Sequence, residues 1–183
     1  MRKNFGAKPY LYPQPVLIVG SYDAQKPDAM NAAWGGISDS AQITMCRARP
    51  QDGEEHFGYR AFTVSMATSD QVVACDYVGM ASEIRSATSW KAGWHTTKSS
   101  FVNAPLIDEL PMALECRLVS YDAQTCCMIG EIVNVSADGS VLDEKGNIDP
   151  AKLRPITFDA VNGTYLALGE KVGNAFSDGR QRM

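Results

Sequence analysis

Short apolar runs separated by polar turns dominate the chain, and most have the length and composition of β-strands. Residues 16–19 are apolar, and residues 29–36 follow them across a polar turn that contains Pro27. Two such runs around a turn predict a β-hairpin. Residues 42–46 and 62–66 are short and rich in β-branched and apolar residues, and they predict two further strands.

The clearest strand pattern covers residues 112–119. Every second position is apolar and faces one side, the period of a half-buried strand: Met112, Leu114, Cys116 and Leu118. Residues 127–135 are the expected antiparallel partner across a turn at 122–125. The later elements are a turn at 143–146, a short helical segment at 148–153, and strands at 156–158 and 165–168.

One helix is expected after the strand at 62–66. Thr68 or Ser69 can cap its start, and Asp70 suits the positive N-terminal end. One helical face collects apolar residues at i, i+4 and i+7: Val73, Tyr77 and Met80. Many short strands with one or two helices predict a mainly β (α+β) protein with a barrel-like antiparallel sheet.

Length and charge set the protein's broad class. The chain has 183 residues, which is enough to bury a hydrophobic core, and residues 1–183 are expected to form a single domain. A net charge of −4 and a pI of about 5.2 give no basic surface for nucleic acid. No apolar run has the length of a membrane span, and the N-terminus lacks the apolar core of a signal peptide. We therefore expect a cytoplasmic protein that binds neither nucleic acid nor membrane.

Cysteines and histidines carry little predicted chemistry. Five cysteines without a C-x-x-C spacing argue against a disulfide framework and a structural zinc site. The adjacent Cys126 and Cys127 suggest redox work, but neighbours in a strand point to opposite faces. His56 and His95 are isolated, so no metal site is expected. Three cysteines in apolar contexts are expected to be buried: Cys46, Cys75 and Cys116.

The stretch 28–36 is the strongest candidate for a ligand site. It reads DAMNAAWGG and follows the first apolar strand. Small side chains and glycines let the backbone approach a flat ligand, and the amide of Asn31 offers both a donor and an acceptor. The alternative is a tight β-corner with a packed Trp34.

Eight short fragments spread over most of the sequence carry a family resemblance: 6–20, 31–36, 61–65, 76–79, 104–107, 114–116, 129–132 and 165–169. In this order and spacing they resemble the flavoredoxin-like branch of the flavin reductase family. The resemblance implies an antiparallel Greek-key split β-barrel that binds FMN and works as a homodimer. It also implies a flavoprotein oxidoreductase that moves electrons between a reduced nicotinamide, NAD(P)H, or an electron-transfer protein and a flavin or other acceptor.

The same resemblance implies the site residues. Along the edge of the isoalloxazine ring, mostly through backbone contacts, it places Asn31, Ala32, Ala33 and Trp34. Around the ribityl group and phosphate it places Arg47, Ala48, Ser65, Met66, Thr68 and Ser82. Ser65 and Thr68 have an alternative role as caps of a strand-to-helix turn. No catalytic side chain is identified, because in a flavin enzyme the cofactor carries the chemistry.

The sequence departs from the family pattern in the two expected phosphate segments, 49–56 and 82–90. Acidic residues stand where neutral or basic ones are usual: Asp52, Glu54, Glu55 and Glu83. These charges predict weak FMN binding, with Arg85 as a compensating cation. They also support an alternative, a non-enzymatic split-barrel binding protein with a weakened or altered phosphate site. A third hypothesis is a thiol-based redox protein built on Cys126 and Cys127.

Overall fold

A computed structural model describes residues 1–23, 26–32, 34–46, 60–81 and 92–182. Seven strands form one antiparallel sheet in the order β2-β1-β5-β8-β9-β4-β3. They are β1 (Leu17–Asp23), β2 (Lys26–Ala32), β3 (Trp34–Asp39), β4 (Gln42–Cys46), β5 (Ala61–Met66), β8 (Met112–Asp122) and β9 (Cys127–Ala137). The hairpin of β1 and β2 and the strands predicted at 42–46 and 62–66 are confirmed. The prediction of one strand over residues 29–36 is wrong, because this stretch is divided between β2 and β3, which belong to opposite edges of the sheet.

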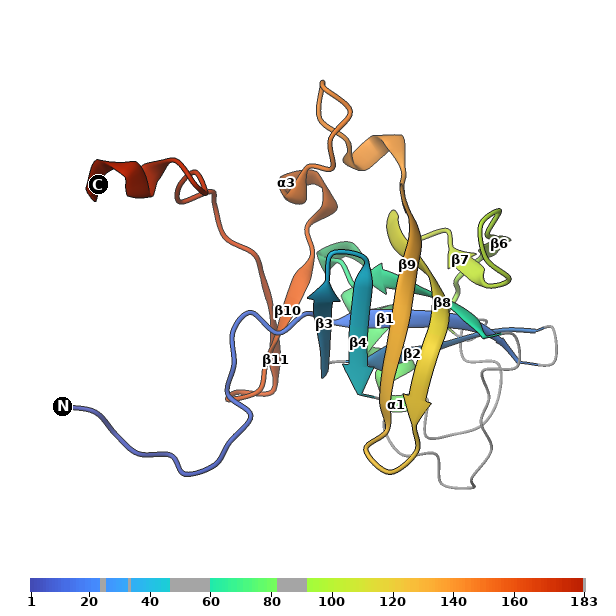
Figure 1. Ribbon diagram of the computed structural model, residues 1–183, viewed down its shortest axis with the longest axis horizontal. Helices are drawn as coiled ribbons and strands as arrows, with labels where there is room; N and C mark the ends of the chain where they lie inside the picture. Colours follow the sequence, from blue (N-terminus) through green and yellow to red (C-terminus); the bar gives the residue numbers. More distant parts are fainter. Residues whose placement is uncertain (24–25, 33, 47–59, 82–91, 183) are drawn as a thin grey trace.

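The sheet curls into a barrel that stays open along one seam. β2 and β3 are consecutive in the sequence, yet they lie at opposite ends of the hydrogen-bonded order. In Figure 1, β1 and β2 cross behind β3, β4, β8 and β9. The predicted mainly β, split-barrel architecture is confirmed. The barrel interior is filled by Leu17, Val19, Ala32, Ile43, Met45, Phe62, Val64, Leu114, Cys116 and Met128.

Phe62 fills the barrel because its neighbour across the interior is a glycine. Phe62 is fully buried, and a Cβ built on Gly130 of β9 would lie 2.4 Å from Phe62 Cζ. Real Cβ atoms essentially never approach a neighbour this closely. The missing side chain of Gly130 therefore provides the space that the aromatic ring occupies.

One helix covers the outer face of the sheet. A 3-10 turn η1 (Ser69–Gln71) leads from Thr68 into α1 (Val72–Ala81), without a side-chain cap from Thr68. The buried residues of α1 are Cys75, Val78 and Ala81. The predicted apolar face is therefore wrong for Val73 and Met80, which are 81% and 63% exposed, whereas Tyr77 packs against the core as predicted.

This error has a physical cause. The sequence of α1, VVACDYVGMA, is apolar nearly all round, so its periodicity does not select a face. Close approach selects it instead, because a Cβ on Gly79 would lie 3.2 Å from Asn31 Nδ2. The side of α1 with Cys75 and Gly79 can therefore pack directly on β2.

Strand β8 is covered on both faces in its first half. Leu114 and Cys116 face the barrel interior as predicted, but Ala113 and Glu115 are buried as well. The prediction of a half-buried strand therefore fails for this half. The carboxylate of Glu115, 1% exposed, accepts hydrogen bonds from Ser99 Oγ and from Asn134 Nδ2, the latter at 2.7 Å.

The remaining elements surround the barrel. They are β6 (Thr96–Lys98), β7 (Pro105–Ile107), η2 (Gly139–Val141), α3 (Pro150–Leu153), β10 (Ile156–Asp159), β11 (Thr164–Ala167) and η3 (Asp178–Arg182). α3, β10 and β11 confirm the late elements predicted from the sequence, and Gly146 N donates to Asp143 O in the predicted turn. None of the helices in the described ranges has the length and apolar character needed to cross a membrane.

Both terminal segments extend away from the barrel on the same side (Figure 1). Tyr12 Oη donates to the carboxylate of Asp159, and this bond and one from Asn162 hold the pKa of Asp159 at about 2. Tyr165 Oη donates to Asp76 Oδ1 on α1 at 2.8 Å. These bonds tether the two terminal segments where they leave the barrel. Beyond them, large apolar side chains are exposed on the projecting segments: Phe5, Leu11, Val172 and Phe176.

Candidate functional site

The stretch 28–36 spans the open seam of the barrel. It runs from the end of β2 into the start of β3, the two edge strands of the sheet. Within the described residues, β3 pairs with β4 and has no second strand beside it. The outward backbone N–H and C=O groups at the start of β3 are therefore available as a row of donors and acceptors.

Trp34 lies on the outer face of this edge. It is 50% exposed, which contradicts the alternative of a packed tryptophan at a tight corner. The next residue, Gly35, faces inward, where a Cβ would lie 2.7 Å from Met45 Cγ and 3.1 Å from Leu17 Cδ1. Glycine thus lets β3 pack onto the barrel interior while Trp34 presents an aromatic surface outside.

Asn31 and Ser65 lie in one row across the sheet. Both pair with Ile18 of β1, on the side covered by α1. Asn31 Nδ2 donates to Cys75 O at 3.4 Å. Among the residues that the structure describes, Asn31 Oδ1 and Ser65 Oγ are buried and have no hydrogen-bond partner. Such groups are usually satisfied by a water or a ligand.

The other predicted site residues that the structure describes lie either on the side of the barrel interior or beside the C-terminal elements. Ala32 and Met66 both pair with Leu17, on the side of the barrel interior. Their side chains pack there, so only their backbone is placed to contact a ligand. Thr68 is buried and forms a β-bridge with Pro155. Four predicted site residues lie outside the described residues: Ala33, Arg47, Ala48 and Ser82. The acidic residues of the two expected phosphate segments also lie outside the described residues.

The arrangement at the seam fits a flat ring whose edge carries both donors and acceptors. An isoalloxazine ring presents an N–H between two carbonyl oxygens, which backbone C=O and N–H groups can match. Asn31 Oδ1 adds a buried acceptor nearby in the sequence, and Trp34 adds an exposed aromatic surface. The ring portion of a flavin therefore has suitable partners here.

Sequence reasoning missed a pair of thiols beside Trp34. Trp34 pairs with Cys46 of β4, and Cys46 pairs with Cys127 of β9. The prediction that Cys46 is buried is wrong, because Met45 faces the interior and alternation turns Cys46 outward. The pairing register of β4 and β9 reveals this pair of thiols, and the residue types alone do not predict it.

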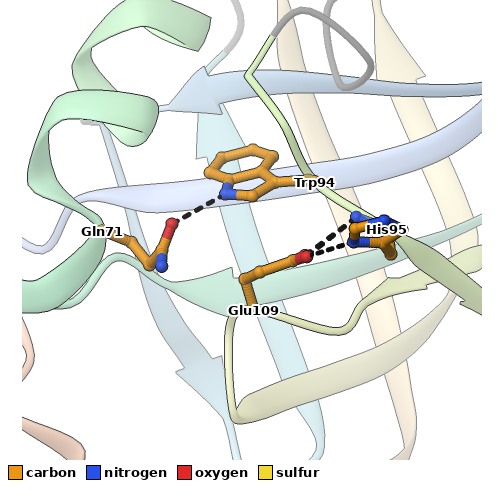
Figure 2. Close-up of polar contacts among 4 residues, drawn as sticks. All are labelled: Gln71, Trp94, His95 and Glu109. Carbon is orange, nitrogen blue, oxygen red and sulfur yellow. Dashed lines mark hydrogen bonds and ion pairs between the residues drawn. The ribbon is translucent and has the colours of Figure 1, made fainter.

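A second set of polar contacts lies beside the start of α1 (Figure 2). Trp94 is buried, and its Nε1 donates to Gln71 Oε1 at 3.0 Å. His95 Nδ1 lies 2.7 Å from Glu109 Oε1, and the backbone N–H of His95 also donates to the Glu109 carboxylate. These contacts fix Trp94 and His95 directly before β6. The hydrogen bond and the charge of Glu109 raise the pKa of His95 above its ordinary value.

We expect the His95–Glu109 contact to stabilise the fold in a pH-dependent way. A raised folded pKa means that the contribution is fully present below about pH 6.5, the unfolded value, and is lost as pH rises through the folded pKa. NMR titration of the His95 ring should give a midpoint above 6.5, and Glu109→Gln should return it toward that value. An unchanged midpoint in Glu109→Gln would contradict this assignment.

Comparisons with known proteins agree on one family. The model of the flavin reductase-like domain matches residues 10–157. The solved flavoredoxin of Desulfovibrio vulgaris (Miyazaki F) is 34% identical, with a TM-score of 0.91 over 98% of this chain and 100% of that chain. The flavoredoxin of Methanosarcina acetivorans, 22% identical, has a TM-score of 0.88 over 100% of both chains and shares the fold.

A curated relative matches a smaller region. An uncharacterized protein of Aquifex aeolicus (strain VF5) is 35% identical over 84 residues, which is 44% of this chain and 42% of that protein. The match therefore spans less than half the length of that relative.

Proposed function

We propose that this protein, which belongs to the flavin reductase-like family, is an oxidoreductase that binds its flavin as FMN. Family membership identifies a flavin as the cofactor. When bound, a flavin accepts and donates electrons singly or in pairs, and the protein positions it and excludes competing reactions. The observation that carries the proposal is the edge of β3 at the open seam, which no other described strand covers, beside the half-exposed Trp34.

The residues at the seam have distinct proposed roles. The backbone of Trp34–Gly36 would hold the edge of the ring, and the indole of Trp34 would cover part of its surface. Asn31 Nδ2 is already bonded to Cys75 O of α1, so the unpartnered Oδ1 is the atom of Asn31 that would be available to a bound ring. The proposed ribityl and phosphate contacts remain those implied by the family: Arg47, Ala48, Ser65, Met66, Thr68 and Ser82.

The electron donor in this proposal is NAD(P)H or an electron-transfer protein, and the acceptor is a free flavin or another small molecule. The seam supports either donor because the edge of β3 is open to solvent, with Trp34, Gly36 and Ile37 exposed. Anaerobic mixing of the FMN-loaded protein with NADH or NADPH tests the enzymatic function. Bleaching of the visible flavin absorption supports a nicotinamide-dependent reductase. Absence of bleaching with both nicotinamides and with a reduced ferredoxin would favour the non-enzymatic binding protein.

The flavin site itself can be tested with Trp34→Ala. We expect about fivefold weaker FMN binding, because loss of an aromatic contact costs on the order of 1 kcal/mol. Titration of FMN fluorescence quenching measures this affinity. Ile37→Ala is the matched control, since Ile37 is an exposed apolar residue of the same strand. Equal affinity in Trp34→Ala, Ile37→Ala and the wild type would place the ring elsewhere.

We further propose that residues 1–183 act as one domain that forms a homodimer. Phe176, on the projecting C-terminal segment, is 97% exposed, and Val73 and Met80 expose apolar surface on α1. Exposed apolar groups of this kind are covered most simply by a second copy of the protein. The bridges Pro15↔Thr157 and Thr68↔Pro155 tie the C-terminal elements to the barrel and support a single domain.

Light scattering tests the assembly directly. We expect a mass of twice 19.9 kDa at micromolar concentration, and a shift toward the monomer for the double variant Val172→Asp/Phe176→Asp. The control is Lys171→Asp/Ser177→Asp, which places the same new carboxylates beside these positions without removing apolar surface. A wild-type mass of 19.9 kDa would reject the dimer.

A further inference from the structure

Cys46 and Cys127 face each other on the outer surface of the barrel. They are directly opposite in the antiparallel register of β4 and β9, next to the interior pair Met45↔Met128. Opposed residues in antiparallel strands have Cα atoms about 4.5–5.5 Å apart, within the span of about 4.4–6.8 Å that a disulfide accepts. Cys46 is exposed and Cys127 is partly exposed, so a small reagent can reach the pair.

We infer that Cys46 and Cys127 are a redox-active dithiol that closes to a cross-strand disulfide by exchange with a small disulfide. The Cys46 thiolate attacks the small disulfide, forms a mixed disulfide and releases one thiolate. The Cys127 thiolate then attacks Cys46 Sγ, closes the cross-strand bond and releases the second thiolate. The two protein thiols are oxidised, the small disulfide is reduced to two thiols, and the two protons pass to the released thiolates.

The geometry selects Cys46, and not Cys126, as the partner of Cys127. Cys126 ends the β8–β9 turn with a left-handed φ of 56° and is buried, and its thiol donates to Ala123 O at 3.8 Å. Cys127 begins β9 and pairs across the ladder with Cys46. Partial desolvation raises the pKa of the Cys46 thiol, and the neighbouring Cys127 raises it further.

A disulfide between Cys46 and Cys127 would stabilise the barrel near its open seam. The row Trp34–Cys46–Cys127 crosses three neighbouring strands, β3, β4 and β9. A disulfide would join β4 covalently to β9 at the end of the ladder, one strand away from the seam. We therefore expect the oxidised protein to unfold at a higher urea concentration than the reduced protein.

The test uses the full-length protein with 2-hydroxyethyl disulfide in excess. A raised Cys46 pKa makes exchange slow at neutral pH, so the incubation is at about pH 9. Acid quenching, alkylation and non-reducing peptide mass spectrometry should show the Cys46 peptide linked to the peptide that contains Cys126 and Cys127. The link should disappear on reduction with dithiothreitol.

Two variants decide which thiol is linked, because Cys126 and Cys127 fall in one tryptic peptide. The link should persist in Cys126→Ala and be lost in Cys127→Ser, with circular dichroism confirming that both variants fold. Loss of the link in Cys126→Ala with retention in Cys127→Ser would overturn the assignment. A wild-type protein that stops at the mixed disulfide on Cys46 would overturn the inference as a whole.

Discussion

Replacing Gly130 with alanine is expected to destabilise the protein by about 2–3 kcal/mol, the upper part of the usual range of about 1–3 kcal/mol for an overpacked core. The new Cβ would lie 2.4 Å from Cζ of the fully buried Phe62, and no exposed surface lets that ring move outward. The small gain in strand propensity from Gly to Ala, about 0.5–1 kcal/mol, does not offset this clash. Urea unfolding followed by circular dichroism measures the difference.

A second substitution tests the cause of this loss. Phe62→Leu in the Gly130→Ala background should cost less than Phe62→Leu alone, because the smaller side chain removes the clash. Gly36→Ala is the control in the same sheet, since a Cβ there meets nothing within 4 Å. Additive effects of Gly130→Ala and Phe62→Leu would show that the two positions do not compete for space.

Replacing Glu115 with alanine is expected to cost about 3 kcal/mol of folding free energy. The substitution leaves the buried Ser99 hydroxyl and the partly buried Asn134 amide without their acceptor, and it opens a cavity beside β8. Ser99 Oγ also accepts from the backbone N–H groups of Phe101 and Val102, at 2.9 and 3.0 Å. Loss of Glu115 therefore also loosens the loop before β7.

Glu131→Ala provides the matched control for Glu115→Ala. Glu131 lies on the partner strand β9, half exposed, with its carboxylate 4.0 Å from Arg117. Exposed ion pairs of this kind contribute less than about 1 kcal/mol. Similar urea midpoints for Glu115→Ala and Glu131→Ala would show that the Ser99–Glu115–Asn134 contacts do not support the fold.

The strands could be predicted from the sequence because period-two patterns and turn residues are local signals. Residues 42–46 coincide with β4, and the hairpin of β8 and β9 follows its alternation. The burial of Glu115 could not be predicted, since its cover comes from Ser99, sixteen residues earlier in the sequence. The buried face of α1 was equally hidden, because packing against Asn31 decides it.

The sequence proposed the stretch 28–36 as a candidate ligand site, but its geometry could not be predicted. Its position at an open seam depends on the order of seven strands, which brings the two ends of the sheet to the same place. The neighbouring Cys46 and Cys127 are 81 positions apart in the sequence, and only the β4–β9 register joins them. The predicted phosphate contacts at Arg47, Ala48 and Ser82 stay predictions.

The unpaired edge of β3 also affects how the site tolerates sequence change. Backbone N–H and C=O groups belong to every residue type, with proline alone lacking the N–H. Substitutions at Trp34 or Gly36 can therefore alter the surface around a proposed ring site while leaving the backbone groups in place. A slip of β3 by one residue against β4 would do the opposite, since it turns each side chain to the other face. The proposed recognition at this edge would thus depend on strand register more than on residue identity, and the inward fit of Gly35 against Met45 and Leu17 favours that register.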